Sequence, residues 1–170
     1  MENIKILKEF LSLEKCENTD KLNNEILAEL RKLQGINITE YPLISGLEEL
    51  LVFLKQNGYV IAIATGSDSN FVETILKFHS IRNYFDVIVT GEQFEFSKPD
   101  PKCFQVAFEK LGITPSNAII IEDSISGIRA AKKMNCRVFG LLTYLSKKNL
   151  SEADLWFENH FGILKFLRNE

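Results

Sequence analysis

The sequence has 170 residues, of which 45% are hydrophobic and 25% charged, and its formal net charge at pH 7 is −3. This length and composition are typical of one well-buried globular domain, with room for a small appendage. The weakly acidic balance gives no argument for a nucleic acid or an anionic membrane as a partner.

Targeting features and paired cysteines are also missing from the sequence. No apolar stretch has the length that a bilayer-spanning helix needs, and the charges of Glu2, Lys5 and Lys8 are wrong for a signal peptide. The three cysteines are far apart and odd in number, with no paired spacing for zinc. We therefore predict a cytoplasmic protein with reduced thiols and no membrane partner.

The first part of the chain predicts two amphipathic helices and no strand. Apolar residues recur at helical spacing over residues 2–15, and again over residues 22–33 after the capping sequence Asn18-Thr19-Asp20. Pro42 disfavours helix just before it, so residues 41–46 form a connector. We predict a partial helical cap over residues 1–45 and a core domain over residues 46–170.

From residue 47 onward, helical and strand patterns alternate. Helices are expected at 47–56, 68–78, 102–111, 125–134 and 161–167, and strands at 59–64, 85–89, 118–121, 136–142 and 155–157. This alternation predicts an α/β fold, a Rossmann-like three-layer arrangement around a parallel sheet with right-handed crossovers.

The stretch Ile119-Ile120-Ile121-Glu122-Asp123 organises the rest of the chain. A short branched apolar run is typical of a buried parallel strand, and two adjacent carboxylates follow where the strand should end. Ligands of open α/β sheets bind at that edge, and paired acids there repel each other unless a cation holds them. The alternative is that Glu122 caps the strand and Asp123 caps the next helix. These residues alone do not decide between the two.

Two other predicted strand ends carry polar residues. Thr65-Gly66-Ser67 offers hydroxyls and backbone N–H groups at the start of a helix, which suits a phosphate, although an ordinary helix cap is the commoner meaning. In Ser97-Lys98-Pro99-Asp100-Pro101, two prolines stiffen the backbone on either side of Asp100, and the lysine before them is suited to a phosphoryl oxygen or simply to solvent. Together, the hydroxyl, the lysine and the paired acids describe metal-assisted phosphoryl transfer.

These residues resemble the haloacid dehalogenase-like hydrolases, in the branch of β-phosphoglucomutase and phosphoglycolate-phosphatase-like enzymes. Residues 61–67 are similar to the second motif of the family, residues 97–101 to the third, and residues 121–131 to the fourth. The resemblance runs from about Pro42 to near the C-terminus. It implies a Mg²⁺-dependent phosphatase or phosphomutase that acts on small phosphorylated metabolites.

The resemblance also implies a role for each motif residue. Thr65 and Lys98 would be the catalytic and phosphate-binding residues, Gly66 and Ser67 would add phosphate contacts, and Glu122 with Asp123 would serve Mg²⁺. The substrate cannot be derived from the sequence, because specificity in this family lies in the cap.

The first motif of the family, a strand ending in Asp-x-Asp, has no counterpart in this sequence. In the family its first aspartate is the nucleophile and its second is the general acid and base. The only aspartate before the second motif is Asp20, at a predicted helix start, and Asp68 follows the wrong strand. Three explanations stay open: a truncated product, one half of a split protein, or a pseudo-enzyme.

The missing motif has a structural consequence in this interpretation. The first strand of the family lies between the strand ending at Thr65 and the one ending at Glu122. Without it, those two strands either pair directly or leave a slot for another chain, either a complementing N-terminal fragment or a second copy. We therefore expect the chain to be inactive by itself.

Two rival classes remain beside this hypothesis. One is a non-catalytic binding or regulatory domain that keeps the phosphate and metal sites. The other is a receiver-type signalling domain with Asp123 as phosphate acceptor, which is weaker because the acid pair would have to precede the acceptor strand.

Overall fold

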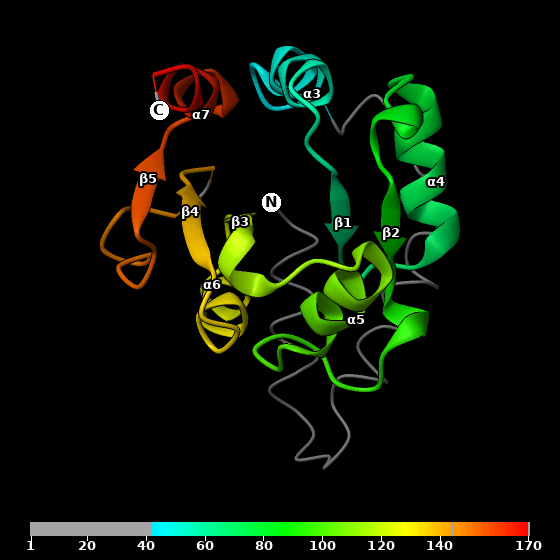
Figure 1. Ribbon diagram of the computed structural model, residues 1–170. Coiled ribbons are helices and arrows are strands. Elements are labelled where there is room, and N and C mark those ends of the chain that lie inside the picture. Colours follow the sequence, from blue (N-terminus) through cyan, green and yellow to red (C-terminus); the bar gives the residue numbers. More distant parts are fainter. Residues whose placement is uncertain (1–41, 144, 170) are drawn as a thin grey trace, which may run out of the picture. The chain divides into compact units, whose positions relative to one another are not determined.

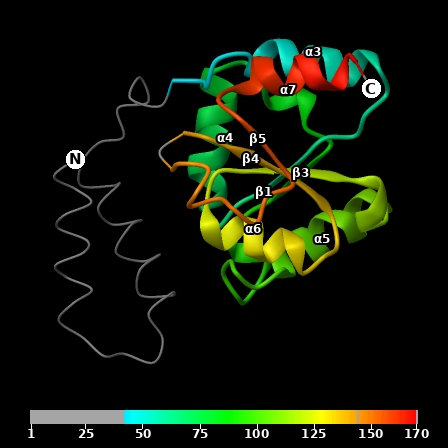
Figure 2. The same ribbon diagram turned by 90° about the vertical axis from the view of Figure 1, so that its left-hand side faces the viewer.

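A computed structural model describes residues 42–143 and 145–169, which belong to one compact unit spanning residues 37–170. The two helices predicted before residue 42 lie outside the described residues, and the predicted domain boundary after residue 45 stays a prediction. The described part is built in three layers, with helices on both sides of parallel strands (Figures 1 and 2). This confirms the predicted α/β class.

Five helices and five strands are described. The helices are α3 (Leu47–Gln56), α4 (Ser69–Phe78), α5 (Lys102–Leu111), α6 (Ile125–Lys132) and α7 (His160–Leu167). The strands are β1 (Ala62–Ala64), β2 (Val87–Val89), β3 (Ile119–Glu122), β4 (Arg137–Leu141) and β5 (Leu155–Phe157). Single 3-10 turns, η2 (Arg82–Tyr84), η3 (Gly91–Gln93) and η4 (Pro115–Asn117), join them.

The first two strands are shorter than predicted. The apolar run from Tyr59 suggested a strand, but β1 begins at Ala62, and Tyr59 and Val60 are about half exposed. The reason lies in the backbone just before β1, because the Ile61 N–H group donates to the carboxylate of Asp86 at 2.8 Å. The carboxylate of Asp86 thus satisfies the Ile61 N–H group just before β1. The last strand, β5, has the predicted bounds, residues 155–157.

All strand pairs are parallel, as predicted, but they form two separate sheets. β1 pairs with β2 in one sheet, and β3, β4 and β5 lie in that order in the other. Among the described residues no strand pairs with the remaining edge of β1 or of β3. The two strands that were expected either to pair directly or to leave a slot, β1 and β3, are therefore not paired with each other (Figure 1).

Each face of the sheets is covered by helices. α5 packs on β1 and β2, and α6 packs on β3 and β4, on the same side. α3 and α7 pack against each other on the opposite side (Figure 2). The buried residues on the α6 side include Ile120, Ile128 and Val138, and those on the α7 side include Phe139 of β4 and Ile163 of α7 itself. This burial fixes the strands whose carboxyl ends carry the polar residues.

No helix in residues 42–143 and 145–169 has both the length and the apolar character required to cross a bilayer. Cys103 and Cys136 are buried free thiols.

Candidate active site

Lys98 connects the two sheets at the carboxyl ends of their strands. Its Nζ atom donates to the main-chain oxygen of Ala64, the last residue of β1, at 3.1 Å. The same atom forms an ion pair with Oε1 of Glu122, the last residue of β3. Nζ also lies 4.7 Å from the centre of the Phe104 ring, which stabilises the cation. The lysine and one predicted acid are therefore brought together.

Glu122 is held on three sides. Besides Lys98, the hydroxyl of Ser124 donates to Oε2 of Glu122 at 3.0 Å. Gly127, in the first turn of α6, lies directly beneath the carboxylate, and a Cβ atom there would collide with it. Gly127 therefore allows the helix to approach this carboxylate closely.

Asp123 does not cap the next helix. The N-cap residue of α6 is Ser124, whose hydroxyl accepts from the Gly127 N–H at 3.0 Å. Asp123 is exposed, and its Oδ2 atom accepts from the hydroxyl of Thr143 at 3.1 Å. Sequence reasoning did not single out Thr143. The signal that could have found it is a polar residue just after β4, the strand that pairs with β3.

Backbone amides of the loop after β1 donate to oxygen atoms of nearby side chains, including the Thr65 hydroxyl. The Ser67 N–H donates to Oγ1 of Thr65 at 3.1 Å, and Asp68 is the N-cap residue of α4, accepting from the Phe71 N–H at 2.8 Å. The Ser69 N–H donates to Glu92 at 2.9 Å, and this hydrogen bond is the main cause of the lowered pKa of Glu92. The amides of Ser67, Ser69 and Phe71 therefore already have acceptors within the protein.

A second loop packs against this one. The Gly91 N–H, just after β2, donates to the Ser67 oxygen at 3.0 Å, and a Cβ atom at Gly91 would collide with the Gly66 oxygen. Thr90 is buried beside it, at 2% exposure. Sequence reasoning missed this support, although Thr90-Gly91 at a strand end repeats the pattern of Thr65-Gly66.

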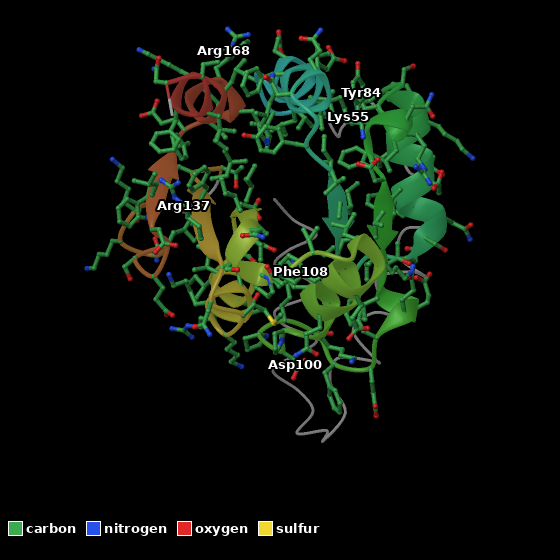
Figure 3. All side chains as sticks on the ribbon, viewed as in Figure 1. Lys55, Tyr84, Asp100, Phe108, Arg137 and Arg168 are labelled. Carbon is green, nitrogen blue, oxygen red and sulfur yellow. The ribbon has the colours of Figure 1, made fainter. Side chains whose placement is uncertain are left out.

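Side-chain hydrogen bonds hold the segment that carries Lys98. The Lys98–Pro99 peptide bond is cis, and Asp100 accepts from the Lys102 N–H at 2.8 Å at the start of α5 (Figure 3). The Lys133 side chain donates to the Pro99 oxygen at 2.9 Å. The side chain of Asp100 therefore stabilises the turn that leads into α5.

Two other side chains near the site are poor nucleophiles. Burial raises the pKa of the Cys103 thiol, while the charge of nearby Lys98 opposes that shift, so the thiol stays protonated at neutral pH. Asp68 is committed to capping α4. Within the part of the chain that the structure describes, no cluster of three or more His, Cys, Asp or Glu side chains could hold a metal ion.

The chain is similar in sequence to known proteins. The family model for haloacid dehalogenase-like hydrolases matches residues 2–141. A phosphorylated carbohydrates phosphatase of Thermotoga maritima is 30% identical over 154 residues, covering 89% of this chain and 69% of the relative. A phosphoglycolate phosphatase of Vibrio vulnificus is 33% identical over 129 residues, covering 71% of this chain and 55% of the relative.

A solved structure shows the same fold. The β-phosphoglucomutase of Clostridium difficile superposes with a TM-score of 0.68 at 26% identity, covering 78% of this chain and 59% of that one. The chain thus spans little more than half of two of these three relatives and about two thirds of the other. The chain belongs to the haloacid dehalogenase-like hydrolases, in the branch of β-phosphoglucomutase and phosphoglycolate-phosphatase-like proteins.

Proposed function

We propose that this chain carries the phosphate-binding and magnesium-binding parts of a phosphatase or phosphomutase site for small phosphorylated metabolites. The observation that supports this most directly is the position of Lys98, which reaches the end of β1 and Glu122 at once. The names of the relatives, which include a carbohydrate phosphate phosphatase and a phosphoglycolate phosphatase, support the substrate class.

In this proposal the phosphate lies between the loop after β1 and Lys98. The Thr65 hydroxyl and the Gly66 amide donate to phosphate oxygens, Ser67 completes the turn, and Lys98 neutralises charge. Lys98 is held by the Ala64 oxygen, Glu122 and the Phe104 ring, so its position needs little reorganisation when the ligand arrives.

Glu122 and Asp123 would hold Mg²⁺ in the same site. Carboxylate oxygens are ligands that Mg²⁺ prefers, and one or two carboxylates with water and a substrate phosphate are a usual set. Asp123 is exposed and oriented by Thr143, which fits that role. When bound, the ion would neutralise charge on the transferring phosphoryl group.

A non-catalytic binding role is the second candidate, and a specific observation favours it. The sequence contains no Asp-x-Asp, and Asp68, the aspartate nearest to Thr65 in the chain, caps α4. A chain with this site can bind phosphate and Mg²⁺ without cleaving an ester.

Ligand-dependent thermal unfolding of the full chain tests the shared part of both candidates. Inorganic phosphate and Mg²⁺ should each raise the midpoint temperature by linkage. Lys98→Ala should abolish the response to phosphate and keep the response to Mg²⁺, because Glu122 loses only a competing cation. Asp123→Asn should weaken the response to Mg²⁺.

Lys165→Ala serves as the control, because this exposed lysine lies on α7, away from the strand ends. It should respond to both ligands as the wild type does. An unchanged phosphate response in Lys98→Ala would refute the phosphate assignment, and an unchanged Mg²⁺ response in Asp123→Asn would refute the metal assignment.

A further inference from the structure

The Thr90 network consists of five polar side chains, Lys110, Gln93, Thr90, Glu92 and Ser69, and joins α5 to the start of α4. Lys110, in the last turn of α5, donates to Oε1 of Gln93 in η3. The Nε2 atom of Gln93 donates to Oγ1 of Thr90 at 3.1 Å. The carboxylate of Glu92 accepts from the N–H group of Ser69 at 2.9 Å and from its hydroxyl at 3.3 Å. Ser69 is the first residue of α4, so the network connects two helices through the turn after β2.

The chemistry of the donors fixes the direction of these hydrogen bonds. A lysine ammonium group only donates, so the Gln93 oxygen faces Lys110 and the Gln93 amide nitrogen faces Thr90. The Thr90 hydroxyl therefore accepts from Gln93 and keeps its own proton for another acceptor. That acceptor is the carboxylate of Glu92. The Ser69 N–H is the main cause of the lowered pKa of Glu92, and the Thr90 hydroxyl lowers this pKa further, against the opposing effect of burial.

Thr90 is the buried link of the network. Its exposed fraction is 2%, whereas Gln93, Glu92 and Ser69 are exposed. A buried hydroxyl costs stability unless its hydrogen-bonding groups have partners. Here the oxygen accepts from the side that leads to α5, and the proton is donated to the side that leads to α4. The hydroxyl of Thr90 thus ties the position of Glu92 to the end of β2.

The network supports the loop after β1 from outside that loop. The Gly91 N–H donates to the Ser67 oxygen at 3.0 Å, and Glu92 binds Ser69 two residues further along. Gly66, just before these two anchored residues, is exposed, and its amide is a phosphate donor in the proposed function. Binding groups need to be held to within about 0.5 Å of their working geometry. The turn after β2 supplies two of the hydrogen bonds that hold this loop.

The start of α4 also has a cap of its own. The side chain of Asp68 accepts from the Phe71 N–H at 2.8 Å, and its main-chain oxygen accepts from the Val72 N–H at 3.1 Å. These contacts lie within one segment and stabilise the first turn of the helix. The contact between Ser69 and Glu92 comes from another strand end, so it fixes where the helix start lies relative to β2, which a local cap does not do.

We propose that Thr90 is a positioning residue of the phosphate site. Through Glu92 it holds the loop of residues 65–69 in the form that presents the Thr65 hydroxyl and the Gly66 amide to a phosphate. This inference rests on the proposed function, since the phosphate assigned there is the ligand that the loop meets. Thr90 itself does not bind the phosphate, because its hydroxyl is buried and both of its hydrogen-bonding groups are already used.

The test is calorimetric titration of inorganic phosphate and of Mg²⁺ into the full chain. Thr90→Val keeps the shape of the side chain and removes the hydroxyl, and should weaken phosphate binding about tenfold, the equivalent of one hydrogen bond to a charged group. Mg²⁺ binding should be unchanged. Thr90→Ser keeps the hydroxyl and should restore most of the phosphate affinity. A purely structural role of Thr90 would lower the stability of the chain and leave the phosphate affinity of the folded protein unchanged.

Two further variants complete the set. Glu92→Ala removes the acceptor of Ser69 at an exposed position, so it tests the same network if Thr90→Val does not fold, and it should also weaken phosphate binding about tenfold. Thr74→Val is the matched control. It makes the same chemical change on α4, where the hydroxyl of Thr74 donates to the Asn70 oxygen within the helix, and should bind phosphate as the wild type does.

Amide hydrogen exchange without any ligand separates this inference from the proposed function. In Thr90→Val and Glu92→Ala the Ser69 amide should exchange about tenfold faster than in the wild type, because its acceptor is displaced or missing. The Thr65 amide, which donates to the Val89 oxygen at 3.0 Å, should keep its protection.

Three results would overturn the positioning role. The first is unchanged phosphate affinity in both Thr90→Val and Glu92→Ala. The second is a Thr90→Ser variant that binds phosphate as weakly as Thr90→Val does. The third is a wild-type chain that binds no phosphate, which overturns the proposed phosphate site and this role with it. In that case faster exchange of the Ser69 amide in the variants would show that the network holds the loop, so the failure would lie in the proposed function.

Discussion

Gly127 lies so close to the carboxylate of Glu122 that no other residue type can take its place without moving that carboxylate. The contact couples the first turn of α6 to the ion pair between Glu122 and Lys98. A helix glycine normally costs stability, so its presence here is explained by the carboxylate rather than by the helix.

The first prediction follows from this contact. Gly127→Ala should gain about 1 kcal/mol from helix propensity, but it should lose about 1–3 kcal/mol from overpacking and from displacement of Glu122. The net effect should be a loss of stability, measured by urea unfolding. In the background Glu122→Ala the clash is gone, so the same Gly127→Ala change should be stabilising. Destabilisation of equal size in both backgrounds would contradict the contact as the cause.

The second prediction concerns Thr143. Its hydroxyl orients Asp123 without reaching the proposed ligands, so it is a positioning residue. Thr143→Val should weaken Mg²⁺ binding by about tenfold, the lower end of the effect of removing an outer-shell hydrogen bond. Thr143→Ser keeps the hydroxyl and should restore most of the affinity. The two variants would be compared by calorimetric Mg²⁺ titration, and identical affinities would show that the hydroxyl has no such role.

The third prediction concerns pH and His160. This side chain is buried at 7% exposure, its Nδ1 atom has no hydrogen-bond partner within the described residues, and burial lowers its pKa below 6.5. The unfolded chain therefore takes up a proton at higher pH than the folded chain does. The stability from neutral His160 is complete above about pH 7 and falls as the pH drops through 6.5 towards the folded pKa.

The slope of stability against pH in that window can reach about 1.4 kcal/mol per pH unit. Unfolding in urea at several pH values between 7.5 and 5.5 measures it. His160→Gln should flatten the curve, whereas a Gln in place of His79, the other histidine of the sequence, should leave it steep. Equal slopes in His160→Gln and the wild type would exclude His160 as the source.

The fourth prediction concerns Asp86, which fixes the start of β1. Its carboxylate accepts from Lys55 Nζ at 2.8 Å and from the Ile61 N–H, and these two hydrogen bonds hold its pKa below the usual 3.8 (Figure 3 labels Lys55). Stability from ionised Asp86 is present above about pH 4 and is lost as the pH falls through the lowered pKa. Because the pair is partly exposed, Asp86→Asn should cost only about 1 kcal/mol at pH 7.

The measurement is acid unfolding from pH 6 to pH 2. Asp86→Asn should lose part of the acid-dependent destabilisation, and Lys55→Met should lose less, since it keeps the hydrogen bond from Ile61. An acid transition in Asp86→Asn equal to that of the wild type would refute this role.

The parts of the site that sequence predicted are those fixed by topology alone. Parallel strands put their carboxyl ends at one edge, which places Thr65 and Glu122, whereas Lys98 reaches Glu122 from a loop that lies beyond β2 and η3 and that topology does not fix. Periodicity also placed α3 and α5 at their observed bounds, because apolar spacing and Gly112 at φ 66° define them locally.

What escaped prediction depends on contacts between loops. Gly91 acts through its approach to Gly66, and Thr143 through its approach to Asp123, and neither relationship has a periodic signature. The capping alternative for Asp123 was wrong because Ser124, one residue later, is in position to accept from the Gly127 N–H. The strand at Tyr59 was overpredicted because hydrophobicity alone does not show which backbone groups find a partner strand.

The last prediction concerns turnover. The sequence has no Asp-x-Asp, Cys103 is buried with a raised pKa, and Asp68 caps α4, so no described group beside Thr65 and Lys98 is suited to attack a phosphate. We therefore expect the purified chain with Mg²⁺ to hydrolyse p-nitrophenyl phosphate and small sugar phosphates no faster than a mock purification does. Lys98→Ala is the matched control. Mg²⁺-dependent hydrolysis that survives rigorous purification and is lost in Lys98→Ala would contradict the expectation. It would require another acid of this chain to be the nucleophile, and mass spectrometry after a rapid acid quench would locate the resulting acyl phosphate.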